Sequence, residues 1–176
     1  MTGAARVAVL TVSDRSFRGE RADASGPAVA DAARRLLDAE VVELRVVPDE
    51  RDDIEWNLRR LADTGTADIV LTTGGTGLGP RDVTPQATAA VLDYEVPGLA
   101  EAMRASSRAV FAAADLSRQI AGVRSRTLIV NLPGSPRGAV ECLEVVAPAL
   151  PHAVATLRGE EGHPARARGS REREET

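Results

Sequence analysis

Four short apolar runs, rich in β-branched residues and separated by segments with helical spacing, constrain the fold more than any other feature of the chain. The runs are residues 6–13, 41–47, 67–73 and 127–132. Runs of this length, bounded by polar residues, are typical of buried β-strands. Strands that alternate with helices favour a mostly parallel sheet with helices on both faces. We therefore predict an α/β fold.

Helical spacing fills the segments between these runs, because apolar side chains recur there at intervals of three and four residues. Ser25 with Pro27, and Thr84 with Pro85, suit the cap and first turn of two of these helices. Proline ends or kinks a helix interior, so Pro148 and Pro151 should interrupt the last one. The helices are expected to begin near Ser25, Asp49, Thr84, Pro97 and Arg137, and their apolar positions include Val29, Leu36, Leu37, Ile54, Leu58, Leu61, Val91, Leu92, Leu99, Met103 and Val110.

Composition limits the class of protein. The 176 residues suit one domain, and 43% of them are hydrophobic, which allows a core without disulfides. The single cysteine, Cys142, forms no internal disulfide, and this fits a reducing cytoplasm. With a net charge of −4 and four aromatic residues, the chain has neither the basic surface nor the stacking residues of a nucleic-acid binder.

The N-terminal residues are interpreted as the start of the first strand rather than as a targeting segment. The N-terminus lacks the long apolar region and cleavage site of a signal peptide. No apolar stretch approaches the ~20 residues of a membrane span. We therefore expect a soluble, cytoplasmic protein. Mixed charge without large apolar residues indicates a disordered tail over residues 159–176, which leaves 1–158 as the folded domain.

Polar residues gather where each predicted strand ends. Ser13 and Asp14 follow the first strand, Asp49 the second, Gly74 to Asp82 the third and Asn131 to Pro136 the fourth. The carboxyl ends of parallel strands meet at one edge of a sheet, and ligands bind outside that edge. The sequence therefore predicts one site built from four loops.

The stretch TTGGTG at residues 72–77 is the most unusual of these segments. Glycines allow successive backbone N–H groups to approach an anion, and threonine hydroxyls add donors. The stretch lacks the lysine of a P-loop, and its GGTGLG spacing at the third strand differs from the dinucleotide fingerprint. Since the chain contains no lysine, cationic help with phosphate would come from arginine, such as Arg81, or from a metal. The alternative is that the glycines only turn the chain.

Two carboxylates accompany this anion-binding turn. Asp82 would repel a bound phosphate unless a cation lay between them, and Mg²⁺ binds through one or two carboxylates plus substrate phosphates. Asp49 reaches the same edge from the second strand and would be the other ligand. Structural alternatives stay open: Asp49 could cap its own helix, and Asp82 could pair with Arg81 or cap the turn before Thr84.

The remaining polar groups indicate no other chemistry. NLPGSP, residues 131–136, is a proline-stiffened loop that presents the Asn131 amide and the Ser135 hydroxyl, or that only turns the chain. His152 and His163 lie away from the predicted edge, and no Cys/His metal spacing is present. No GxSxG nucleophile motif occurs with partners in place.

Taken in order, several motifs of the chain resemble the MoaB/Mog family of molybdenum cofactor biosynthesis. The family's GGTGxxxRDVTP pattern is present, and the other matching segments are VSDR at 12–15, DxSGP at 23–27, VPDE at 47–50, LSR at 116–118, NLPGSP at 131–136 and EC at 141–142. The resemblance covers roughly residues 6 to 158.

This resemblance implies a three-layer α/β/α sandwich, a homotrimer and a molybdopterin adenylyltransferase that uses ATP and Mg²⁺. The family's two important aspartates fall on Asp49 and Asp82, as catalytic and metal-binding residues, and its pterin-phosphate loop falls on Gly74 to Gly77. Contact with a molybdotransferase would follow. The substrate-binding candidates are Ser13, Asp14, Thr73, Gly74, Gly75, Thr76, Gly77, Arg81, Ser117, Asn131, Pro133, Gly134, Ser135 and Pro136.

One position departs from the family. The residue after DVTP is often acidic, and here it is Gln86, which alters the charge beside the site. The alternative function is a molybdopterin-binding or carrier protein without catalysis, although both aspartates are retained. The larger molybdotransferases that contain this domain need further domains.

Overall fold

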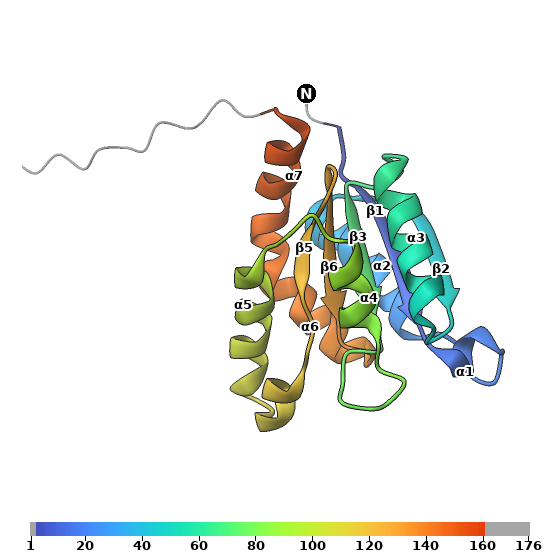
Figure 1. Cartoon of the computed structure of the whole chain (residues 1–176). Coiled ribbons are helices and arrows are strands. Elements are labelled where there is room, and N and C mark those ends of the chain that lie inside the picture. Colours follow the sequence, from blue (N-terminus) through green and yellow to red (C-terminus); the bar gives the residue numbers. More distant parts are fainter. Residues whose placement is uncertain (1–2, 161–176) are drawn as a thin grey trace, which may run out of the picture.

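The computed structural model describes residues 3–160, which form a six-stranded sheet between two layers of helices (Figure 1). The elements in chain order are β1 (Arg6–Val12), α1 (Asp14–Phe17), α2 (Ser25–Leu37), β2 (Glu40–Val47), α3 (Arg51–Asp63), β3 (Ile69–Thr73), α4 (Thr84–Val91), β4 (Tyr94–Glu95), α5 (Pro97–Arg108), η1 (Ala112–Leu116), β5 (Ala121–Arg124), β6 (Thr127–Leu132), α6 (Pro136–Val146), η2 (Ala147–Ala149) and α7 (Leu150–Arg158).

The sheet has the order β2-β1-β3-β6-β5-β4. The four predicted strands, β1, β2, β3 and β6, are parallel to one another, while β5 pairs antiparallel with β6 and β4 antiparallel with β5. The predicted mostly parallel α/β/α fold is therefore confirmed. Since β2 and β3 lie on opposite sides of β1, the chain changes direction beside β1, and this is the position at which ligands bind in open α/β sheets.

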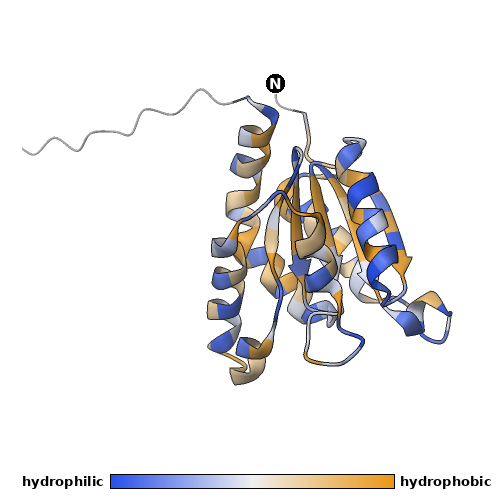
Figure 2. Ribbon diagram, viewed as in Figure 1, coloured by the Kyte–Doolittle hydropathy of each residue, from blue (hydrophilic) through white to orange (hydrophobic). Residues whose placement is uncertain are grey.

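Alternating strand residues divide the core into two halves. Val7 and Val9 of β1 pack with α2, α5, α6 and α7, whereas Ala8 and Leu10 pack with α3 and α4. This alternation follows from the two-residue period of a strand. Figure 2 shows the result: apolar strands are enclosed by helices whose outer turns are polar. The sheet is therefore covered on both faces, and its strand ends stay accessible.

Several predicted helix boundaries need correction. Thr84 lies inside α4 and Val83 is the N-cap; the Thr84 hydroxyl instead donates to the Gly74 carbonyl oxygen (2.8 Å). In α2, the Asp23 carboxylate accepts from Gly26 N (3.0 Å), so Asp23 does the capping that was assigned to Ser25. The helix that was predicted to reach Val110 ends at Arg108.

The C-terminal helical region also differs from the prediction. Pro136–Arg158 is 23 residues long and, by length and composition alone, apolar enough to cross a membrane. The expectation that no apolar stretch approaches this length is therefore wrong, because Pro148 and Pro151 do not interrupt the segment. Buried side chains of this segment, including Leu143, Val146 and Leu150, pack in the core, and core helices meet the same criteria. Pro148 lies in η2 and Pro151 in the first turn of α7, where no N–H is needed. The predicted tail lies outside the described residues from position 161 on.

Candidate active site

The glycine turn follows β3 at the lower edge of the sheet in Figure 1, beside the end of β1. Gly74 has φ +104°, and a Cβ added there would meet the Val12 carbonyl oxygen at 2.4 Å. Gly75 has φ +65°, and a Cβ added there would meet Thr84 Oγ1 at 2.3 Å. Only glycine fits both positions, because an L side chain would be strained and would collide with its neighbour. The turn is thus held tightly between β1 and the start of α4.

Asp14 and Asp49, which follow β1 and β2, bind each other reciprocally. Asp14 N donates to the Asp49 carboxylate (2.6 Å), and Asp49 N donates to the Asp14 carboxylate (3.0 Å). Asp49 does not cap α3, since Glu50 is the N-cap residue and no side chain caps that helix. The helix-cap alternative for Asp49 is therefore wrong, and the two loops are joined at the site.

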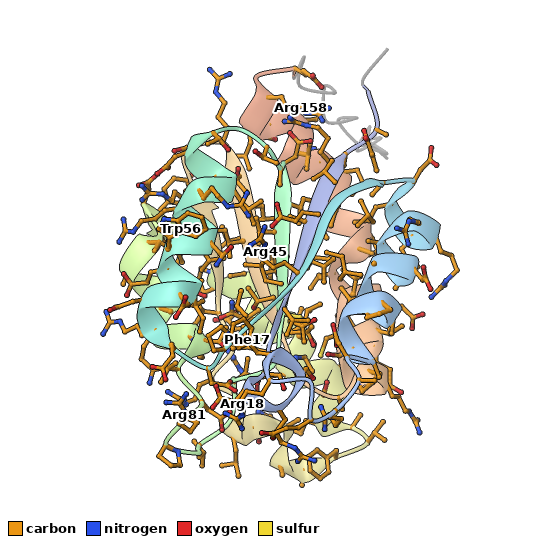
Figure 3. All side chains as sticks on the ribbon, turned by 90° about the vertical axis from the view of Figure 1, so that its right-hand side faces the viewer. Phe17, Arg18, Arg45, Trp56, Arg81 and Arg158 are labelled. Carbon is orange, nitrogen blue, oxygen red and sulfur yellow. The ribbon has the colours of Figure 1, made fainter. Side chains whose placement is uncertain are left out.

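Arg81 adds the positive charge at this edge. Its guanidinium donates to both oxygens of Asp14 (2.9–3.1 Å) and to Glu50 (2.8 Å). Figure 3 shows Arg81 at the same end of the molecule as Arg18. Arg81 pairs with Asp14 and Glu50 rather than with Asp82, so that alternative is wrong. The Asp82 carboxylate accepts from Gly79 N (2.8 Å), which confirms that it caps the turn before Thr84.

Both predicted metal-binding aspartates border the same glycine turn. A Cβ added at Gly75 would lie 3.4 Å from the Asp49 carboxylate, and one added at Gly77 would lie 2.9 Å from the Asp82 carboxylate. The aspartates therefore lie beside positions of one loop that are two residues apart, although they follow different strands. Their meeting at one sheet edge was the central prediction from the sequence.

The charges of this cluster shift two pKa values in opposite directions. Burial raises the pKa of Asp49, and the negative charges of Asp14 and Asp82 raise it further. The backbone N–H of Asp14 and the charge of Arg81 lower this pKa but do not outweigh the other effects. Burial also acts on Asp14, but the N–H of Asp49 and the Arg81 guanidinium outweigh it, so the pKa of Asp14 is lowered. An additional cation beside Asp49 would therefore relieve repulsion that the fold leaves in place.

A cleft of about 900 Å³ opens on one side of the turn. Its walls come from the turn, from the second half of α5 and the segment between α5 and β5, and from α6 with the loop before it. Five of the predicted site residues line it: Thr76, Gly77, Ser117, Pro133 and Ser135. Other predicted residues, including Asp14 and Asp49, do not line it. The site therefore has two parts, an open cleft and a carboxylate cluster, with the glycine turn between them.

The NLPGSP loop is fixed against the turn by short contacts. Thr73 Oγ1 donates to the Pro133 carbonyl oxygen (2.8 Å), and a Cβ added at Gly134 would lie 3.2 Å from Gly74 Cα. Ser135 is the N-cap of α6 and accepts from Gly138 N (3.2 Å), and Pro136 occupies the first turn. This loop holds one wall of the cleft rigidly.

Comparison with known proteins agrees with this geometry. The model of the family described as "Probable molybdopterin binding domain" matches residues 8–152, which include every predicted site residue. The chain belongs to the MoaB/Mog family. It is 44% identical over 154 residues to a molybdopterin adenylyltransferase of Helicobacter pylori, covering 87% of this chain and 88% of that protein.

Two further relatives also have names in molybdopterin biosynthesis. A molybdopterin adenylyltransferase of Escherichia coli is 43% identical over 142 residues, covering 80% of this chain and 73% of that protein. The crystal structure of the molybdopterin biosynthesis enzyme MoaB from Thermus thermophilus is 52% identical with a TM-score of 0.82, covering 88% of this chain and 97% of that one. The family resemblance seen in the motifs is therefore confirmed.

One predicted site residue of this MoaB/Mog chain lies in the interior. Asn131 is fully buried, its amide donates to Thr72 (2.9 Å) and Thr88 (3.0 Å), and its oxygen accepts from Ile120 N (3.4 Å). It joins β3, β6 and α4 and does not line the cleft. The structure thus gives Asn131 a packing role that explains its position at the end of β6.

Arg118 is a site residue that reasoning from the sequence missed. Its backbone N–H donates to the Thr76 carbonyl (3.0 Å), Nε to the Gly77 carbonyl (2.7 Å), and the terminal nitrogen to the Asp82 carbonyl. Arg118 therefore holds the glycine turn through its backbone N–H and its guanidinium. The LSR motif was the available signal, but a sequence does not reveal a partner 41 positions away.

Proposed function

We propose that this chain is a molybdopterin adenylyltransferase, which transfers AMP from ATP to the terminal phosphate of molybdopterin and releases pyrophosphate. The observation that carries the proposal is that Asp49 and Asp82 border one glycine turn that also opens onto the cleft. Relatives that are 43–44% identical over most of the chain carry this activity in their names. A carrier protein would have no use for two carboxylates beside an anion-binding turn.

The glycine turn and the cleft suit the two parts of molybdopterin. Backbone N–H groups at Gly75 to Gly77 and the Thr76 hydroxyl would be donors for the terminal phosphate, whereas the Gly74 N–H donates to the Leu132 carbonyl oxygen (3.2 Å). The adjoining cleft, of about 900 Å³, is large enough for the pterin. ATP would then lie toward Ser13, Asp14 and Arg81, where an exposed guanidinium is held in place by two carboxylates. This arrangement aligns two polyanions across the turn.

The residues present fit Mg²⁺. Asp49 and Asp82 offer the hard oxygen ligands that the ion prefers, and unrelieved repulsion at Asp49 favours an added cation. Within residues 3–160 no cluster of three metal-binding side chains occurs, so phosphates and water would complete the coordination. When bound, the ion would neutralise charge on the polyphosphate.

The chemical step needs positioning more than proton transfer. An oxygen of the molybdopterin phosphate attacks the α-phosphorus of ATP, and the bond from that phosphorus to the bridging oxygen of the β-phosphate breaks. The electron pair leaves with pyrophosphate. A phosphate monoester is already largely ionised near neutral pH, so no general base is required. The protein's part is to hold the phosphate at the glycine turn and to orient Asp49 and Asp82.

The test is AMP transfer with α-labelled ATP, Mg²⁺ and molybdopterin, comparing wild type with Asp82→Asn. We expect pterin-dependent pyrophosphate release by the wild type and a fall of ~100-fold or more in the variant, because charge stabilisation in the transition state is lost. Asp31→Asn is the control, since its carboxylate is exposed and pairs only with Arg34 among the described residues.

The outcomes distinguish an adenylyltransferase from a carrier protein and test the metal-binding role of Asp82. Wild-type protein that binds molybdopterin but releases no pyrophosphate would be a carrier. If Asp82→Asn transfers AMP at the wild-type rate, the proposed metal-binding role of Asp82 is wrong. Homotrimeric assembly, contact with a molybdotransferase and a cytoplasmic location belong to the proposal on family resemblance alone. Light scattering after size-exclusion chromatography measures the first of these.

A further inference from the structure

Gln119 is a buried cleft residue with an unmet hydrogen-bond acceptor. The side chain is 2% exposed and lines the cleft, yet its Oε1 atom has no donor among residues 3–160. Leaving a buried acceptor without a donor costs folding stability. Such a cost inside a binding cleft indicates a group whose partner arrives with the ligand.

The backbone around Gln119 is fixed on both sides. Arg104 Nη1 donates to the Gln119 carbonyl oxygen (2.8 Å), which ties the residue to α5. The preceding residue, Arg118, binds the carbonyl groups of Thr76 and Gly77 through its N–H groups. Gln119 therefore keeps a constant position relative to the glycine turn, as a specificity-determining group requires.

The surroundings of Gln119 favour a neutral, flat ligand. Cys142 and Ser107 share a contact of 3.7 Å and line the same cleft. Burial raises the pKa of the Cys142 thiol, against hydrogen bonds from Ser107 and Gln119, so the thiol is uncharged at neutral pH. The charged residues of the cleft lining are two arginines and two glutamates, so their formal charges balance. Leu116 and Phe111 add apolar surface and an aromatic ring. A planar heterocycle with N–H donors at its edge matches this lining.

We propose that Gln119 selects the pterin ring, its side-chain oxygen accepting a hydrogen bond from the ring's N–H donors. This inference rests on the proposed function. Adenine also carries N–H donors, but Thr76 and Gly77 line the same cleft as Gln119, and that is where the proposal puts the pterin's phosphate. Asp14 and Arg81, assigned to the nucleotide side, lie outside the cleft lining.

The test is Gln119→Met, which keeps the length of the side chain and removes the acceptor. We expect the KM for molybdopterin to rise about tenfold, the equivalent of one hydrogen bond, with kcat and the KM for ATP unchanged. Gln119→Glu keeps an acceptor oxygen and should recover most of the affinity. The melting temperature of Gln119→Met should stay the same or rise, because an unpaired acceptor has been removed.

A direct binding measurement separates this inference from the proposed function. Calorimetric titration of wild type and Gln119→Met with molybdopterin, without ATP, reports on the pterin site whether or not AMP is transferred. If Gln119→Met loses affinity tenfold and the wild type transfers no AMP, the pterin-binding role of Gln119 is supported and the proposed adenylyltransferase activity is rejected. A raised KM for ATP alone would assign Gln119 to adenine and overturn the inference, as would a lower melting temperature with unchanged molybdopterin affinity.

Discussion

At the scale of single residues, Asp49 gives the sharpest prediction. Asp49→Asn should lower AMP transfer by ~100-fold or more while the melting temperature stays the same or rises. The residue does not cap α3, an amide oxygen still accepts from Asp14 N, and burial disfavours the charge that the substitution removes. Differential scanning fluorimetry and the transfer assay measure the two effects. Normal transfer with a loss of ~1 kcal/mol in stability would instead assign Asp49 a structural role, as the acceptor that holds the Asp14 loop.

The sequence could predict some site residues because their placement depends on strand ends alone. Asp49 and Asp82 reach one edge by the geometry of a parallel sheet. Asn131 lies two residues beyond Ile129 and so on the same strand face, toward α4, which the strand period would have revealed. Gln119 was not predictable, since an unmet acceptor is defined by every group that packs around it.

At the scale of elements, the glycine turn is the most constrained connection. Gly74→Ala should destabilise the fold by ~2 kcal/mol or more, because it combines a left-handed backbone with a collision against the Val12 carbonyl. Gly98→Ala is the matched control: it lies in the first turn of α5 with nothing within 4 Å of an added Cβ, so it should be neutral or slightly stabilising. Urea unfolding measures both. Equal stability of the two variants would contradict this account of the turn.

Elements with strong patterns were predictable and short ones were not. The central strands β1, β2, β3 and β6 are β-branched runs, and the predictions of these strands are confirmed. β5 is four residues, AGVR, and β4 is two, too short for an alternating pattern. They form through pairing with β6 and with each other rather than through local preference.

At the scale of the whole molecule, the two ends of the described chain meet at Asp68, at the edge opposite the site. Arg6 Nη2 (2.9 Å) and Arg158 Nη2 (2.6 Å) both bind its carboxylate, whose side chain is 7% exposed. Arg158 also donates to the carbonyl groups of Gly3 and Ala4. Figure 3 shows Arg158 at the end of the molecule away from Arg81.

This contact predicts how stability depends on pH. Burial opposes ionisation of Asp68, but hydrogen bonds from Arg6 and Arg158 lower its pKa from 3.8 to about 2. Because the folded pKa is depressed, the stabilisation of about 2 kcal/mol is complete above pH 3.8 and is lost as the pH falls through 2. Asp68→Asn should therefore lower the free energy of unfolding at pH 7 by about 2 kcal/mol and flatten its decline between pH 4 and pH 2. Urea titrations across this range measure it, and an unchanged slope would contradict the assignment.

Asp68 and the glycine turn are separated by one strand, the five residues Ile69–Thr73, or about 17 Å. The groups that keep the chain folded in acid and the groups proposed to handle phosphate thus occupy opposite ends of the same β-strand. Substitutions at Asp68 should therefore change the acid tolerance of the protein and leave AMP transfer unchanged.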